Sequence, residues 1–345
     1  NGDKEILPLE CNTREIFEHT LNDYEADFSN VQGQENIKRA LEIAAAGGHN
    51  VIMIGPPGAG KTMLAKRLPS ILPPMTLKEA LETTKIHSVA GKIKDAGLMS
   101  QRPFRSPHHT ASSVALVGGG SYPQPGEISL SHNGVLFLDE LPEFKREVLE
   151  VMRQPLEDRE VTISRAKFTI TYPSSFMLVA SMNPSPSGYF NDPNAPMTST
   201  PAEMQRYLSK VSGPLLDRID IHVEVTPVPF DKLSDDRSGE LSKVIRERVI
   251  KARNIKTTRF NDSETIFYNA QMGVKQIRQF CKLNETSIKL LKIAMKQLNL
   301  SARAYDRILK VSRTIADLQG SENILSEHIS EAIQYRSLDR EGWLG

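Results

Sequence analysis

The chain has 345 residues, which is enough for about two domains of ordinary size. Lysine and arginine total 43 and aspartate and glutamate total 42, so the formal net charge is +1, and 39% of the residues are hydrophobic. This composition excludes a disordered chain, and no apolar run reaches the roughly 18 residues that a membrane-spanning helix needs. The two cysteines, Cys11 and Cys281, are too few for a disulfide scaffold and favour a reducing compartment, the cytoplasm.

Residues 1–28 are acidic and weakly patterned, and we treat them as an approach segment. From 29 to 229, short apolar runs alternate with helical patterns, which is typical of an α/β domain. Uninterrupted apolar runs, which suit strands covered on both faces of a parallel sheet, occupy 51–54, 135–138 and 176–179. Residues 219–225 alternate instead, as in a strand nearer the sheet edge.

Prolines at 227 and 229 mark a boundary, after which the pattern becomes helical. Apolar residues recur at helical spacing in segments that begin near Leu241, Ile288, Ile308 and Ile324. We therefore predict a small all-α domain over residues 230–345.

One glycine-rich segment links an apolar run to a predicted helix. In order, its residues are Gly55, Pro56, Pro57, Gly58, Ala59, Gly60, Lys61 and Thr62. This strand–loop–helix pattern is a P-loop, in which glycines let backbone N–H groups converge on phosphate oxygens. Lys61 would supply a charge for the β- and γ-phosphates, and the Thr62 hydroxyl would ligate Mg²⁺. The pattern predicts ATP and Mg²⁺; the alternative is a glycine turn without a ligand.

Acidic and amide side chains follow two further predicted strands. Asp139 and Glu140 come directly after residues 135–138, at the sheet edge where α/β proteins bind ligands. Asp139 would hold the metal, directly or through water, and Glu140 would polarise the attacking water. Asn183 ends the third strand and could position water or the γ-phosphate, although Asn-Pro is also an ordinary turn pair.

Several longer motifs accompany these residues in a fixed order. They occupy 31–34, 104–112, 116–120, 125–134, 138–144, 212–220 and 300–304. With them the chain resembles the AAA+ ATPases of the helix-2-insert group, and most closely the magnesium-chelatase-like ComM/YifB family, from residue 29 to the C-terminus. The resemblance implies a P-loop AAA+ core with a parallel sheet sandwiched by helices, a small all-α lid, and self-association into a ring, a hexamer.

The resemblance also implies roles for single residues. Val31 and Met63 would complete the nucleotide-binding set, with Val31 beside the adenine. Asn183 occupies the sensor-1 position, and Arg218 that of an arginine finger reaching the neighbouring subunit; the alternative is a surface arginine paired with Asp217 or Asp220. Arg303 occupies the sensor-2 position and would bind nucleotide in its own subunit or across the interface.

Two insertions bear on what such a ring would act on. Residues 116–129 resemble the helix-2 insert, and residues 161–170 alternate around a basic tip, which predicts a β-hairpin. Such hairpins line the ring pore in the family, so Arg165 and Lys167 at the tip would contact a phosphate backbone. A solvated charged turn is the alternative.

Two apparent metal sites are not predicted to bind metal. Many relatives carry Cys-Pro-Cys-Gly where this chain has residues 185–188, Ser-Pro-Ser-Gly, and serine is a poor zinc ligand. The pair His108–His109 has no carboxylate or cysteine in register, so we expect hydrogen-bonding or packing roles for it.

For function, the resemblance implies an ATP-driven motor on single-stranded or branched DNA, aiding branch migration during DNA uptake and recombination. The alternatives are a magnesium-chelatase-type ATPase subunit that drives Mg²⁺ insertion into protoporphyrin, and a nucleotide-gated scaffold. Full-length relatives carry an N-terminal Lon-protease-like domain, so the start at Asn1 suggests a missing N-terminal half.

Overall fold

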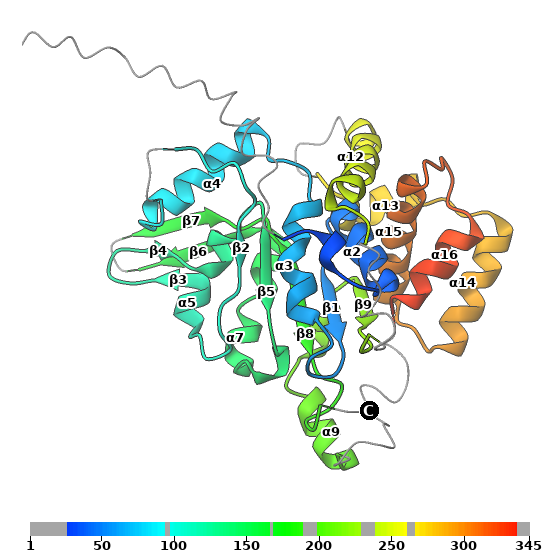
Figure 1. Ribbon diagram of the computed structural model, residues 1–345, viewed down its shortest axis with the longest axis horizontal. Helices are drawn as coiled ribbons and strands as arrows, with labels where there is room; N and C mark the ends of the chain where they lie inside the picture. The colour runs from blue at the N-terminus through cyan, green and yellow to red at the C-terminus, as the bar shows by residue number, and fades with distance from the viewer. Residues whose placement is uncertain are drawn as a thin grey trace, which may run out of the picture.

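A five-stranded parallel sheet forms the centre of the molecule. The structure, a computed structural model, describes residues 26–93, 97–165, 168–188, 199–228, 239–260 and 266–336. In spatial order the strands are β2 (Phe104–Arg105), β5 (Val135–Leu138), β8 (Met177–Met182), β1 (Val51–Ile54) and β9 (Ile221–Glu224). Every neighbouring pair is parallel, so all carboxyl ends meet at one edge (Figure 1). The predicted parallel sheet is confirmed, with β9 at its edge.

Successive strand residues enter two separate hydrophobic clusters. In β1, Val51 and Met53 join the cluster on one face, whereas Ile52 and Ile54 join the cluster on the other. All four are essentially inaccessible to water. Because strand side chains alternate between faces, a strand covered on both sides needs an unbroken apolar run, which explains the sequence pattern.

Helices cover both faces of the sheet. One face is covered by α2 (Glu35–Gly47) and α3 (Lys61–Ile71). The short η1 (Phe28–Asn30) precedes α2 in the chain and contributes Phe28 to the same hydrophobic cluster. The opposite face is covered by short elements: α6 (Glu127–Leu130), η2 (Leu141–Glu143), α7 (Arg146–Glu150), α8 (Arg153–Asp158), α9 (Pro201–Leu208) and α10 (Gly213–Leu216). This is the sandwiched α/β core that the sequence predicts.

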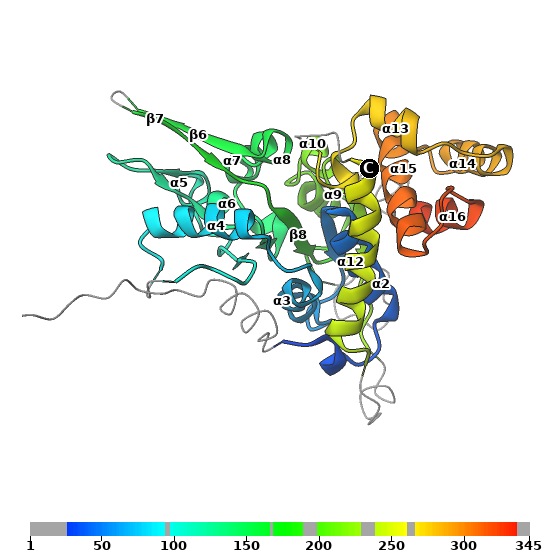
Figure 2. The same ribbon diagram turned by 90° about the horizontal axis from the view of Figure 1, so that it is seen from above.

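Two small hairpins extend from one end of the core. One joins β3 (Gly118–Gly119) to β4 (Gln124–Pro125), beside α4 (Leu77–Val89) and α5 (Ser113–Val117). The other joins β6 (Glu160–Ser164) to β7 (Thr169–Pro173) in antiparallel register. Figure 2 shows both hairpins projecting away from the C-terminal helices. The predicted hairpin is therefore present; Lys167 lies outside the described residues.

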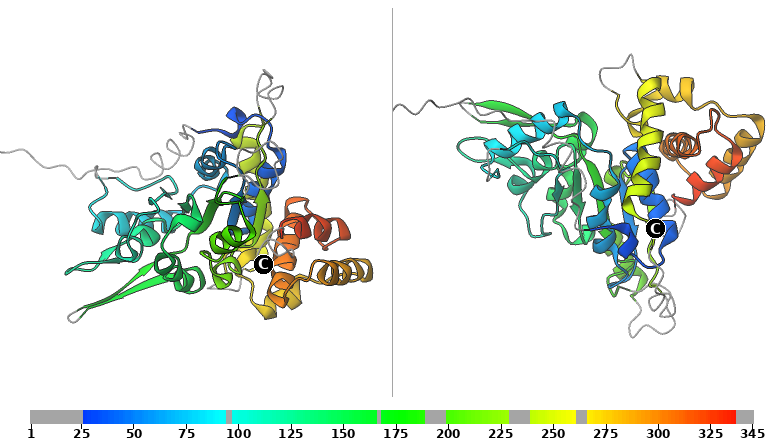
Figure 3. Two further views of the ribbon diagram at one scale, coloured as in Figure 1. Left: turned by 90° about the horizontal axis from the view of Figure 1, so that it is seen from below. Right: turned by 45° about the horizontal axis from the view of Figure 1, so that its top comes forward.

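The region after residue 239 is helical, as predicted. It contains α12 (Ser242–Arg259), η3 (Asn269–Gln271), α13 (Val274–Phe280), α14 (Glu285–Gln297), α15 (Ala302–Leu318) and α16 (Ser326–Gln334). Two further views show these helices at the end of the molecule opposite the hairpins (Figure 3). Within the described residues, no helix has the length and apolar character needed to cross a bilayer.

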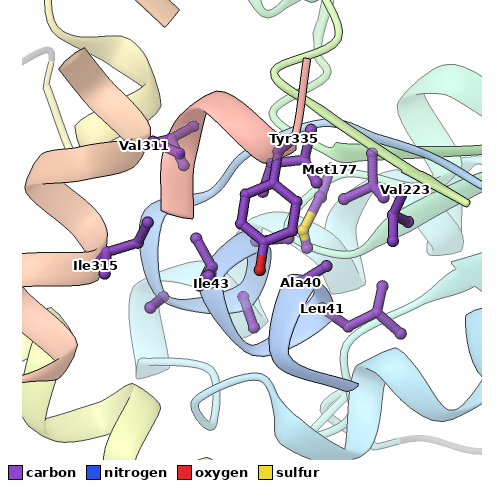
Figure 4. Close-up of a cluster of buried hydrophobic side chains, with 14 of the residues drawn as sticks. Ala40, Leu41, Ile43, Met177, Val223, Val311, Ile315 and Tyr335 are labelled. Atoms are coloured by element: carbon purple, nitrogen blue, oxygen red, sulfur yellow. The ribbon is translucent and has the colours of Figure 1, made fainter. Parts of the chain in front are cut away.

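The C-terminal helices share one hydrophobic core with the α/β region. Figure 4 shows side chains from α2, β8, β9 and α15 meeting around Tyr335: Ala40, Leu41, Ile43, Met177, Val223, Val311 and Ile315. The chain after α16 also reaches the sheet edge, where the His222 N–H donates to the Tyr335 carbonyl at 2.8 Å. The helical region therefore packs as a continuous extension of the sandwich.

Candidate nucleotide-binding site

The glycine-rich loop lies at the carboxyl edge of the sheet, between β1 and α3. Gly55 closely approaches β9, since a Cβ there would lie 2.1 Å from the carbonyl oxygen of Val225. Gly58 and Gly60 have φ values of 77° and 89°, in the left-handed region that glycine favours. Gly60 is the N-cap of α3 and makes no side-chain cap hydrogen bond. The first N–H groups of α3 thus lack a side-chain acceptor, as in helices that bind phosphate.

Lys61 points into the loop. Its ammonium donates to the carbonyl oxygens of Gly55 and Pro56 at 2.5 and 2.9 Å and to Asn183 Oδ1 at 3.1 Å. Burial lowers the pKa of the Lys61 ammonium, and the carboxylates of Asp139 and Glu140 oppose this shift. A charged, mostly buried ammonium beside the loop can neutralise phosphate oxygens.

Thr62 and Asp139 meet across the loop. The Thr62 hydroxyl donates to Asp139 Oδ2 at 2.7 Å, and the Ser181 hydroxyl donates to the other carboxylate oxygen. Ser181 comes from β8, where Leu138 pairs with Ala180, so the residues that follow this pair are also neighbours. A hydroxyl and a carboxylate are oxygen donors of the kind that Mg²⁺ prefers, so these side chains fit that ion.

Glu140 has an unusual backbone conformation beside this pair. Its φ is 54° and ψ 52°, and its N–H lies 3.1 Å from Asp139 Oδ1 and 3.2 Å from Ser181 Oγ. The side chain is half exposed, with Oε2 3.6 Å from His109 Nδ1. A left-handed non-glycine residue costs roughly 1 kcal/mol or more and is most often retained at functional sites. The Glu140 carboxylate thus lies beside His109 and close enough to Lys61 to act on its charge.

Asn183 follows β8 directly and is held by its backbone. Tyr207 of α9 donates its hydroxyl to the Asn183 carbonyl at 3.2 Å, and burial raises the pKa of that phenol. Near the end of the same segment, Gly188 packs so closely on Pro57 that a Cβ would lie 2.9 Å from its ring. The segment after β8 therefore contacts both the lysine and the glycine-rich loop.

The remaining predicted nucleotide contacts differ in exposure. Val31 is fully buried in the core just before α2, whereas Met63 is 37% exposed on the first turn of α3. Pro57 and Gly58 are exposed, and Ala59 is buried. The structure thus brings Lys61, Thr62 and the loop together with the acidic and amide residues at one edge.

Arg218 and Arg303 lie at the amino ends of the strands, opposite the carboxyl ends that carry the glycine-rich loop. Arg218 precedes β9, whose first residue pairs with Val51, and its backbone carbonyl accepts from the Asn50 amide at 2.8 Å. Its guanidinium donates to the Pro214 carbonyl at 2.5 Å and pairs with Glu157. Arg303, at the start of α15, pairs with Asp217. The two arginines are thus near each other and away from Lys61.

The hairpin tip is separate from both groups. Arg165 donates to its neighbour's carbonyl, Ser164 O, at 3.0 Å. Phe168 on the same hairpin faces Tyr122 of the shorter hairpin, with ring centroids 6.4 Å apart. Tyr122 is 75% exposed. The tip therefore combines a guanidinium with accessible aromatic rings.

The histidine pair and residues 185–188 make local contacts. His108 Nδ1 lies 2.9 Å from Thr110 Oγ1, and the His109 ring packs edge-on against Phe144 with centroids 6.4 Å apart. Ser185 and Ser187 hydroxyls lie 2.9 Å apart. Across the parts of the chain that the structure describes, no cluster of three or more histidine, cysteine or acidic residues forms a metal site.

Comparison with known proteins identifies the family. A family model described as magnesium chelatase, subunit ChlI, matches residues 27–233, and the model of its C-terminal region matches residues 239–336. The chain belongs to this family.

Three bacterial proteins are among the relatives of this chain. Competence protein ComM of Haemophilus influenzae is 50% identical over 316 residues, which is 91% of this chain and 60% of that protein. The YifB protein of Escherichia coli is 48% identical over 315 residues. The magnesium-chelatase 38 kDa subunit of Rhodobacter capsulatus is 27% identical over 177 residues. The chain spans about three fifths of ComM and YifB, and its resemblance to the ComM/YifB proteins is confirmed.

Sequence reasoning missed several residues of this magnesium chelatase-family site. Ser181 and Tyr207 contact the predicted residues but belong to no short motif. His109 lies in the 104–112 motif, where the sequence predicted a hydrogen-bonding or packing role but not its contact with Glu140. Ser181 could have been found by aligning the carboxyl ends of β5 and β8. His109 and Tyr207 come from distant segments, and their proximity depends on the tertiary fold.

Proposed function

We propose that this chain is a Mg²⁺-dependent ATPase that works as a ring and moves on DNA. The main support is that the glycine-rich loop contacts side chains that follow two strands. The Lys61 ammonium donates to Asn183 Oδ1 at 3.1 Å, and the Thr62 hydroxyl donates to Asp139 Oδ2 at 2.7 Å. These four polar side chains come from three segments and meet at the phosphate-binding end of α3.

The proposed chemistry assigns one task to each group. The loop N–H groups and Lys61 bind the β- and γ-phosphates, with the Lys61 ammonium exchanging its carbonyl contacts for phosphate oxygens. Thr62 and Asp139 would hold Mg²⁺, which neutralises charge developing on the phosphates when bound. Ser181 keeps the Asp139 carboxylate oriented toward Thr62.

Glu140 is proposed to accept the proton of the attacking water. Its exposed carboxylate can reach solvent, and the His109 ring 3.6 Å away limits where it points. Asn183 would orient the water or a γ-phosphate oxygen through its amide. General-base catalysis of this kind typically contributes about 10²–10⁴ in rate.

The positions of Arg218 and Arg303 favour action on a neighbouring copy. The four residues of β1 separate the two sheet edges by about 13 Å at 3.3 Å per residue. Both guanidinium groups lie at the edge away from Lys61, so we propose that they complete the nucleotide site of the adjacent subunit, in a hexamer. An arginine supplied in this way accelerates phosphoryl transfer by about 10³–10⁵ in other systems.

DNA is the proposed track, in single-stranded or branched form. Support comes from the name of the relative ComM, a competence protein, and from the projecting hairpin that carries Arg165. A guanidinium can bind phosphates, and the exposed rings of Tyr122 and Phe168 can stack on bases. Lys167 belongs to the same proposed contact.

A second candidate is a chelatase-type ATPase subunit acting on a partner that holds protoporphyrin. The observation in its favour is the family itself, described as a magnesium chelatase subunit. The relative that carries this name is far less similar, with 27% identity over 177 residues.

Mixing two inactive variants tests the proposal. Lys61→Ala removes the cation of the loop, and Arg218→Ala removes the proposed finger. If arginines act across an interface, an equimolar mixture regains ATPase activity that neither variant has alone. ATPase assays with single-stranded DNA, duplex DNA or a chelatase partner extract distinguish the two candidate functions by which addition stimulates the activity. Inactivity of the mixture contradicts action in trans, and stimulation by the extract alone favours the second candidate.

A further inference from the structure

An arginine-lined cavity lies at the amino ends of the strands, on the side of the sheet away from the glycine-rich loop. A cavity of about 250 Å³ opens there between the sheet and the C-terminal helices. Its lining includes Asn50, Gly134 and Met177, each at or just before the start of a strand. Its charged lining residues are Arg102, Glu157, Arg159, Arg218, Asp220, Arg253 and Arg307.

Three of these five arginines have carboxylate partners. Arg102 lies 3.2 Å from Glu79, Arg307 lies 3.0 Å from Asp220, and Arg218 pairs with Glu157. Arg102 also donates to the Asn133 carbonyl at 2.7 Å. The charges of these three are therefore balanced within the fold.

Arg159 and Arg253 are different. Within the described residues, the Arg159 guanidinium has no hydrogen-bond or ion-pair partner, and Arg253 has no carboxylate within ion-pair distance. Arg253 donates to the Ala45 carbonyl at 2.6 and 3.0 Å and also hydrogen-bonds with Tyr268. Arg253 also stacks on the Tyr268 ring at 4.7 Å, and the Lys256 ammonium lies 4.3 Å from the same ring. Two guanidinium groups thus line the cavity without a directly paired carboxylate, and the nearest acidic influence on Arg253 is Glu79, which already pairs with Arg102.

The surroundings make this charge unfavourable as it stands. Burial lowers the pKa of Arg159 to about 10. Burial also lowers the pKa of Arg253, with a further contribution from nearby Arg102 and against opposing effects of Tyr268 and Glu79. Burial and the charge of Arg253 lower the pKa of Lys256 to about 7. Buried like charges destabilise a fold unless an anion compensates them.

We propose that this cavity is a phosphate-binding site in which Arg159 and Arg253 hold the anion. Two guanidinium groups without a directly paired carboxylate match the roughly two negative charges of a phosphate or phosphate ester near neutral pH. Planar guanidinium groups pair with phosphate oxygens in bidentate geometry. Since the lining comes from both the sheet and α12, a bound phosphate bridges the α/β core and the C-terminal helices. Its source is either free phosphate or the terminal phosphate of a nucleotide held by an adjacent copy.

The full chain carrying Lys61→Ala provides the test, because this variant weakens phosphate binding at the glycine-rich loop. Inorganic phosphate is titrated by calorimetry against potassium chloride of equal ionic strength. We expect saturable binding that Arg159→Gln or Arg253→Gln weakens about tenfold or more. Arg159→Lys should retain part of it, and Arg153→Gln, an exposed arginine of α8, should leave it unchanged. The proposal is overturned if no phosphate binding is detected. It is also overturned if phosphate binds but neither Arg159→Gln nor Arg253→Gln changes the affinity.

A second arm identifies the source of the phosphate. The Lys61→Ala chain is offered a Glu140→Gln copy preloaded with ATP, and association is followed by sedimentation. Association that added phosphate displaces and that Arg159→Gln weakens points to the neighbour's nucleotide. Phosphate binding without such association points to free phosphate. If neither arm shows a response that depends on Arg159 or Arg253, the cavity is not a phosphate site.

Discussion

The carboxylate of Glu157 on α8 is paired with the guanidinium of Arg218, which is only 16% exposed. If Arg218 acts on the nucleotide of a neighbouring copy, as we propose, its guanidinium has to leave this partner and the Pro214 carbonyl. An ion pair with one exposed member contributes up to about 1 kcal/mol.

Weakening that pair should therefore favour the active arrangement. We expect Glu157→Gln to raise ATPase activity at limiting protein concentration, by up to about fivefold. Steady-state phosphate release over a range of chain concentrations measures the effect. Glu150→Gln, which removes the partner of Arg153 on a neighbouring helix, is the matched control. A lower rate for Glu157→Gln would instead give Glu157 a supporting role in the site.

Lys61→Ala should abolish nucleotide binding, because it removes the ammonium that the glycine-rich loop surrounds. Fluorescent ATP-analogue titration measures this. Lys66→Ala, on the exposed side of α3, should bind as the parent chain does. Unchanged affinity of the Lys61 variant would place the nucleotide elsewhere.

Glu140→Gln should leave ATP affinity within about threefold of the parent and reduce turnover by about 10²–10⁴, since only proton transfer is lost. His109→Ala should give a smaller loss, because it removes a positioning contact at 3.6 Å. Single-turnover hydrolysis and equilibrium binding separate the two effects. Parental turnover in the Glu140 variant would exclude it as the base.

Arg165→Ala should reduce DNA stimulation of the ATPase while leaving the basal rate unchanged, because the hairpin tip is distant from the nucleotide site. Loss of one phosphate contact should also reduce the salt dependence of single-stranded DNA binding by a slope of about 0.7. Binding isotherms at several salt concentrations measure both. Equal slopes for parent and variant would assign Arg165 to a solvated turn.

Acid should destabilise the fold partly through His222, which is 1% exposed. Burial and the nearby Arg336 guanidinium hold the pKa of His222 well below its usual value, against a weaker opposing effect of Asp220. The unfolded chain therefore takes up the proton first, so this contribution to stability is present above about pH 6.5 and is lost as pH falls below it. The expected slope is up to about 1.4 kcal/mol per pH unit.

Urea unfolding at pH 7.5, 6.5 and 5.5 measures this slope, and His222→Gln should make it shallower. Burial also lowers the pKa values of His87 and His132, so a residual slope of the same sign should persist. Identical slopes in parent and variant would show that His222 does not contribute.

The sequence predicts the sheet and the loop well because their signals are local. An unbroken run such as 135–138 requires cover on both faces, and the spacing from Gly55 to Thr62 is sufficient to specify a turn into a helix. Contacts across the fold are not encoded in this way. The pairing of Arg218 with Glu157, rather than with the adjacent Asp217 or Asp220, depends on how α8 packs beside the start of β9. Asp217 and Asp220 instead pair with Arg303 and Arg307 of α15.

The apolar cluster around Tyr335 has a practical consequence for dissecting this protein. Helices α12 and α15 bury side chains against α2, so excising residues 239–336 would expose the matching surfaces of both fragments to water. We expect the excised helices to aggregate or to remain molten when produced alone, and to be rescued by co-expression with the remainder of the chain. We therefore expect the α/β core and the C-terminal helices to unfold in one cooperative transition.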